Sequence, residues 1–127
     1  MLIEVLNGTP KGAKLLAAVR SGAARPHMSL VNIAEAAYIL CRKVGHAAAR
    51  TRIDALLASG YVAVEDDLSI HLAAAEIKCE RSISLSDCYT MAVARAIRSG
   101  ALFASREKEL VDETRRRPFD QPVHFLD

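Results

Sequence analysis

Residues 83–110 read ISLSDCYTMAVARAIRSGALFASREKEL, and this stretch carries the clearest pattern in the chain. Ser86 to Arg98 is predicted to form a helix that is apolar on almost every side, as expected of a helix at the centre of a domain. Gly100 separates it from the apolar run 101–104, which predicts a short strand. A charged helix then runs from Glu107 to Arg117 and is broken by a proline. The stretch therefore predicts a buried helix, a strand and a surface helix in succession.

The same alternation continues outward from this stretch. Other strands are predicted at about 27–30, 61–65 and 123–126. Other helices are predicted from Thr9-Pro10 to about Ser21, and at Asn32–Val44, His46–Ser59 and Leu68–Lys78. Tyr61–Val64 is expected to be a buried strand, and the polar stretch Cys79–Ser82 is expected to be a loop. Alternating strands and helices predict a three-layer α/β/α fold with a mostly parallel central sheet, whose ligand site lies beyond the carboxyl ends of the strands.

The composition is that of one compact domain covering residues 1–127, with 51% apolar and 25% charged residues. A net charge of +2 neither indicates nor excludes nucleic-acid binding. Cys41, Cys79 and Cys88 are far apart and odd in number, so neither a disulfide framework nor a zinc site is expected. A cytoplasmic location is expected, because no signal peptide is recognisable and no apolar run approaches the roughly 18 residues of a membrane span.

Acidic residues follow three of the predicted strands. Glu35 is expected in the first turn of its helix, Asp87 opens the most apolar helix, and Glu107 follows strand 101–104 with Glu109 close behind. Taken singly, each acid has a structural explanation. Ser84 to Asp87 fits a capping box, Asn32 to Glu35 has similar spacing, and acids in a first turn complement the helix dipole.

Together, these acids indicate a metal site. Carboxylates that converge on one edge of a sheet repel one another, so they are best tolerated around a cation. Oxygen ligands suit Mg²⁺ or Mn²⁺. Such a site can activate a water for hydrolysis of a phosphodiester.

Three segments resemble the PIN domain, and in particular the VapC toxins of prokaryotic toxin–antitoxin pairs. They are MSLVNIAEAAYIL at 28–40, ISLSDC at 83–88 and LFASREKEL at 102–110. The resemblance implies a metal-dependent endoribonuclease that is held in check by a small antitoxin. It also implies that Glu35 and Asp87 are metal ligands and that Glu107 is the acid of the third motif.

The sequence departs from the family pattern at two places. In the third motif, Ser105 takes the place of a threonine, and Glu107 and Glu109 replace aspartates, which puts each carboxylate one methylene farther out. At the front, Leu2 to Leu6 and the following Gly8-Thr9-Pro10 resemble the family's first helix and turn. The family's first strand and its catalytic Asp are therefore expected before Met1, and Glu4 is the nearest acid that could substitute.

Other charged groups have ordinary explanations. Asp66 and Asp67 are interpreted as an acidic helix start. The four histidines lack metal-ligand spacing and are expected at surfaces or interfaces. The basic residues could attract RNA phosphates or line a solvated face. They are Lys11, Lys14, Arg20, Arg25 and the run Arg115–Arg117.

Two functional hypotheses follow from the sequence. The first is a Mg²⁺- or Mn²⁺-dependent ribonuclease toxin with RNA as substrate and an antitoxin as partner. The second is a catalytically impaired PIN domain that binds RNA or protein, which the missing acid and the two Asp-to-Glu changes favour. The helix pair 32–59, with Tyr38, Ile39, Leu56 and Leu57, is predicted to form a homodimer or antitoxin-binding surface.

Overall fold

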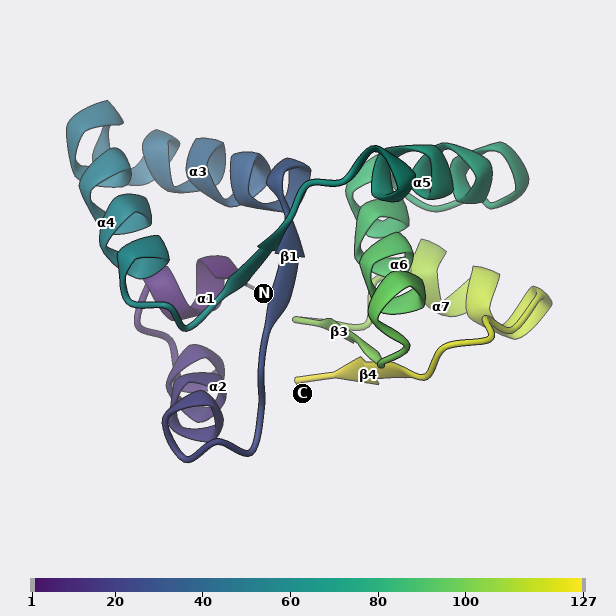
Figure 1. Ribbon diagram of the computed structural model, residues 1–127, viewed down its shortest axis with the longest axis horizontal. Coiled ribbons are helices and arrows are strands. Elements are labelled where there is room, and N and C mark those ends of the chain that lie inside the picture. The colour runs from purple at the N-terminus through teal and green to yellow at the C-terminus, as the bar shows by residue number, and fades with distance from the viewer. Residues whose placement is uncertain (1, 127) are drawn as a thin grey trace. The chain divides into compact units, whose positions relative to one another are not determined.

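The computed structural model describes residues 2–126 (Figure 1). Within these residues the chain is mixed α/β, with seven helices and four short strands. The helices are α1 (Leu2–Leu6), α2 (Pro10–Arg20), α3 (Leu30–Val44), α4 (His46–Ala58), α5 (Leu68–Glu80), α6 (Leu85–Ile97) and α7 (Lys108–Arg116). The strands are β1 (His27–Ser29), β2 (Ala63–Glu65), β3 (Ala101–Phe103) and β4 (Val123–Phe125). None of the helices in this part of the chain is both long and apolar enough to cross a membrane.

The chain divides into two compact units, Met1–Val64 and Glu65–Asp127. The strands form two-stranded sheets, in which β1 pairs with β2 and β3 pairs with β4. The β3–β4 pair is parallel, with Ala101 opposite Val123. The sequence prediction of an α/β fold with parallel strands is confirmed, and each predicted strand corresponds to a strand of the structure.

In the N-terminal unit, α1 and α2 are held together through Thr9. The Thr9 hydroxyl caps α2 by accepting a hydrogen bond from the Gly12 N–H at 3.1 Å. The same hydroxyl donates to a carboxylate oxygen of Glu4 at 2.5 Å. Gly12 faces the α1 backbone so closely that an added Cβ would overlap the Glu4 carbonyl, so glycine is required for this packing.

Helices α3 and α4 form a hairpin on the N-terminal unit. Gly45 caps the end of α3 and the start of α4 with φ of +86°. Glycine adopts this conformation without strain because it has no Cβ atom to clash with the backbone. The buried residues Ile33, Ala36 and Ile53 pack with Leu2 of α1 in one core cluster. The predicted helix pair is thus confirmed, and its inner face is the core of this unit.

In the C-terminal unit, α6 is the central helix that the sequence predicts. Its N-cap Ser84 accepts a hydrogen bond from the Asp87 N–H at 3.2 Å. The buried residues of α6 are Cys88, Tyr89, Met91, Ala92, Val93 and Ala94. Helix α5 packs against α6 and contributes buried residues Ile70, Ala74 and Ile77 (Figure 1).

Three local predictions are wrong. The loop predicted at Cys79–Ser82 begins two residues later, at Arg81. Helix α5 continues to Glu80, and the Arg81 N–H donates a hydrogen bond to the Ile77 carbonyl at 2.9 Å. The strand after α4 is not fully buried, since Val64 is 42% exposed. Helix α3 begins at Leu30 instead of Asn32, because Ser29 is its N-cap.

Candidate functional site

Glu35 lies in the second turn of α3, and no acid lies in the first turn. Ser29 caps this helix: its hydroxyl accepts a hydrogen bond from the Asn32 N–H at 3.1 Å and donates to the Asn32 side-chain oxygen at 2.7 Å. The predicted Asn32–Glu35 capping box is therefore wrong. The Glu35 side chain is half-buried and forms no hydrogen bond or ion pair with any residue from 2 to 126. Neither a cap nor the helix dipole, which acts within the first turn, explains this acid.

Asp87 lies in the first turn of α6 and is half-buried. Its N–H donates to the Ser84 hydroxyl, so the Ser84 half of the predicted capping box is present. The position of Asp87 at a helix start is thus compatible with a structural role as well as with a ligand role.

Glu107 and Glu109 lie together at the start of α7, after β3. Glu107 occupies the N-cap position but its side chain makes no capping hydrogen bond. Both side chains are exposed to solvent. A carboxylate at an N-cap that does not bond the helix backbone is available for another ligand.

The predicted ligands are divided between the two units of the chain. Glu35 belongs to the unit Met1–Val64, whereas Asp87, Glu107 and Glu109 belong to the unit Glu65–Asp127. Among residues 2–126, no group of three or more His, Cys, Asp or Glu side chains is gathered so that it could hold a metal ion. The donor types nevertheless fit a hard cation, because all four side chains offer carboxylate oxygens.

Glu4 has a local structural role. Its carboxylate accepts the hydrogen bond of the Thr9 hydroxyl, and Thr9 is the residue that caps α2. This contact accounts for an acid at this position without any catalytic function.

A chain of polar contacts in the C-terminal unit was not predicted. His71 Nδ1 lies 2.8 Å from the hydroxyl of Tyr89, and Nε2 lies 3.4 Å from a carboxylate oxygen of Asp66. Tyr89 is buried and His71 is half-buried. His71 and Tyr89 are 18 residues apart on different helices, so no sequence spacing signals their contact. The neighbouring Asp67 caps α5 as predicted, and hydrogen bonds from Ser69 lower the pKa of its carboxyl.

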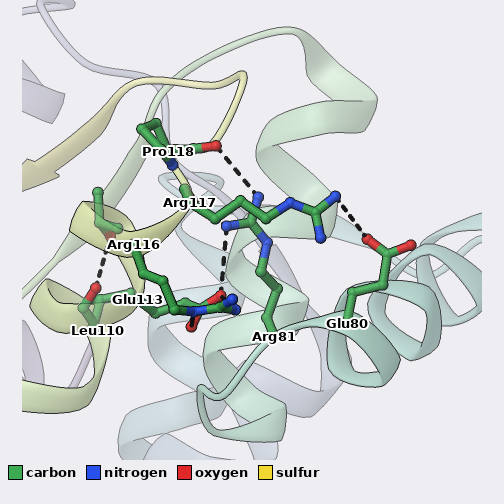
Figure 2. A network of polar contacts seen from close by, with 8 residues as sticks. Glu80, Arg81, Leu110, Glu113, Arg116, Arg117 and Pro118 are labelled. Atoms are coloured by element: carbon green, nitrogen blue, oxygen red, sulfur yellow. Dashed lines mark hydrogen bonds and ion pairs between the residues drawn. The ribbon is translucent and has the colours of Figure 1, made fainter.

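The arginine run near the C-terminus forms part of an ion-pair network (Figure 2). Glu113 is only 3% exposed and accepts hydrogen bonds from Arg116 at 2.6 and 3.0 Å. Arg81 lies 3.6 Å from the same carboxylate, and Arg117 pairs with Glu80 at 3.3 Å. Two of the three arginines in the run Arg115–Arg117 are therefore paired within the protein.

The same network fixes the segment that follows α7. Arg81 donates hydrogen bonds to the carbonyl oxygens of Arg117 and Pro118, and its guanidinium lies 4.0 Å from the centre of the Phe119 ring (Figure 2). The hydrogen bonds from Arg116 lower the pKa of the Glu113 carboxyl. This arrangement is structural, because the charges satisfy one another and the backbone.

Short parallel strands, a buried central helix and acids after the strands make up a mixed α/β protein. The model of the PIN domain family matches residues 1–114, and the chain belongs to this family. No curated protein matches the chain. PIN domains generally bind divalent metals, and PIN-domain proteins commonly bind RNA and antitoxin partners.

Proposed function

We propose that this protein is a Mg²⁺- or Mn²⁺-dependent endoribonuclease and the toxin of a VapBC-type toxin–antitoxin pair. The observation that carries the proposal is Glu35, a half-buried carboxylate without a hydrogen bond or ion pair among residues 2–126. A partly exposed carboxylate that no side chain of the described residues neutralises is accessible to a cation from solution. Because PIN domains generally bind divalent metals, a divalent ion is the cation that we propose.

In this proposal the four acids act as oxygen ligands. Glu35, Asp87, Glu107 and Glu109 would each offer carboxylate oxygens to a divalent ion, and the side chains of Glu107 and Glu109 are one methylene longer than aspartate. A bound divalent ion supplies a more acidic water and a counter-charge for the phosphate. The carboxylates would hold that ion through their oxygens.

The cleavage assay uses RNA with Mn²⁺ present and absent. We expect Glu35→Gln and Asp87→Asn each to lower the cleavage rate by about a hundredfold or more, because a lost ligand weakens metal binding and water activation together. The control is Glu76→Gln, which makes the same chemical change at an exposed position of α5. Variants that cleave as fast as the parent, or a parent that cleaves equally well in chelator, would contradict the proposal.

The second candidate is a PIN domain that binds RNA or protein without cleaving it. Glu107 and Glu109, which stand where the family pattern has aspartates, favour it. A binding module keeps its RNA affinity in chelator and shows no cleavage with Mn²⁺. Loss of RNA affinity on chelation would argue against the second candidate.

The proposed surface for an antitoxin or a second copy is the outer face of the α3–α4 hairpin. Tyr38 is 49% exposed there, and the Arg42 guanidinium lies 5.0 Å from its ring centre. Leu56 and Leu57, which the sequence assigned to this surface, pack against the core instead. The proposal therefore rests on the Tyr38 side of the hairpin. Tyr38 and Arg42 could stack with a partner as an aromatic–cation pair.

Tyr38→Glu should disrupt this surface without disturbing the core, because the side chain is half exposed. We expect a lower mass in light scattering if the partner is a second copy. We expect loss of co-purification if the partner is an antitoxin encoded beside the protein. A variant that assembles with both as the parent does would show that this face is not an interface.

The reducing cytoplasm is the proposed location, in keeping with three cysteines that form no disulfide. We also propose that residues 1–127 act as a single PIN domain, because the family match over residues 1–114 extends into both units of the chain.

A further inference from the structure

The turn between α3 and α4 brings a thiol and an imidazole together. Cys41 lies in the last turn of α3, and His46 is the first residue of α4. Gly45, with φ of +86°, reverses the chain between them. As a result, Cys41 Sγ lies 3.4 Å from His46 Nδ1, which is hydrogen-bonding distance for sulfur. The thiol can donate to the neutral ring nitrogen, so a base stands beside a potential nucleophile.

The two other cysteines lie in different environments. Cys88 is fully buried in α6, and burial raises the pKa of its thiol. Cys79 is exposed on α5, whereas Cys41 is only partly exposed. If access to reagents alone set the reaction rates, Cys79 would react before Cys41. The neighbouring imidazole reverses that expectation, because the thiolate is the reacting species.

We propose that Cys41 is a site of reversible thiol–disulfide exchange with low-molecular-weight disulfides, and that His46 is the base that accepts its proton. The proton passes from Sγ to Nδ1, and the sulfur attacks one sulfur of the small disulfide. The S–S bond of the reagent breaks as the new S–S bond forms. The leaving thiolate takes the proton from the imidazolium, so one thiol and one disulfide are consumed and one of each is produced.

The surroundings of the pair favour this reaction. Arg42 and Lys43 follow Cys41 in the last turn of α3, and both are exposed. Their positive charges favour the approach of small disulfides that carry carboxylates. The contact between Cys41 and His46 is itself exposed, so a small reagent can reach the sulfur.

The test treats the folded full-length protein with a small amount of 4,4′-dithiodipyridine at neutral pH and assigns each modified cysteine by peptide mass spectrometry. We expect Cys41 to react about tenfold faster than Cys79, and Cys88 to react last. A thiol reductant should restore the free thiol. In denaturant, the three rates should converge, because the imidazole is no longer held beside the sulfur.

The matched variant is His46→Gln, which keeps a polar side chain but removes the base. The Cys41 rate should fall to about that of Cys79, while the Cys79 rate serves as an internal control and stays unchanged. A Cys41 rate no faster than that of Cys79 in the parent protein would overturn the proposal, whether or not the variant folds. An unchanged Cys41 rate in a folded His46→Gln protein would also overturn the proposal. The same holds if Cys41 still reacts faster than Cys79 in denaturant.

Discussion

At the scale of single residues, the carboxylates of this protein fall into two kinds. Glu113 is buried, paired with arginines and hydrogen-bonded, and Glu4 is bound by Thr9. Both carboxylates accept hydrogen bonds from the protein itself and stabilise the contacts around them. Glu35 and Glu107 have neither a cap nor an ion pair among residues 2–126, which is why they are the better candidates for binding something outside the chain.

Glu113 gives a prediction about acid stability. Its pKa is held below the ordinary value of 4.5 by the hydrogen bonds from Arg116, so its ionised form stabilises the fold. That contribution is complete above the unfolded-state pKa and is lost as the pH falls through the folded-state pKa. We expect Glu113→Gln to lower the free energy of unfolding by about 2 kcal/mol at neutral pH, because Arg81 is left without its buried partner.

Urea unfolding at about pH 7 and about pH 3 checks this prediction, because the difference between parent and variant should shrink at the lower pH. Glu76→Gln is the control for the same chemical change at an exposed site, and it should leave the stability within about 0.5 kcal/mol of the parent. An equal loss for Glu113→Gln at both pH values would mean that the ionised carboxylate does not stabilise the fold.

At the scale of elements, helix ends set where the acids lie. The N-cap Ser29 starts α3 two residues earlier than the sequence spacing suggested, and this moves Glu35 from the first turn to the second. Ser84 starts α6 as predicted and leaves Asp87 in the first turn. A two-residue difference in the start of α3 therefore decides whether the helix dipole explains Glu35.

Ser29→Ala tests the cap of α3. The hydroxyl is buried at 1% exposure and bonds both the backbone and the side chain of Asn32. We expect a loss of about 1–2 kcal/mol in unfolding free energy, as for other lost N-caps. Thermal or urea denaturation measures it, with the exposed Ser99→Ala as control. If the two variants are equally stable, Ser29 does not cap the helix in solution.

The sequence predicted the elements well because their ends are marked by local chemistry. Thr9-Pro10, Gly45 and Ser84 each signal a boundary that depends only on neighbouring residues. Contacts between distant residues carry no such signal. The bonds of Arg81 to the segment after α7 and the His71–Tyr89 contact arise from packing between helices, so only the structure reveals them.

At the scale of the whole molecule, the candidate ligands are shared by two compact units. The family match covers residues 1–114 and therefore extends into both units. If Glu35 and Asp87 are metal ligands, as we propose, Mn²⁺ binding must depend on each of these residues. A measurement of metal binding therefore tests the proposed ligand residues and the proposed ribonuclease activity together.

The most direct test of the proposed metal site is calorimetric titration of Mn²⁺ into the full chain and into the Glu35→Gln, Asp87→Asn and Glu76→Gln proteins. We expect a Mn²⁺ site in the parent and in Glu76→Gln, with affinity reduced about tenfold or more in each of the other two variants. Unchanged affinity in both Glu35→Gln and Asp87→Asn, or no Mn²⁺ binding by the parent protein, would contradict it.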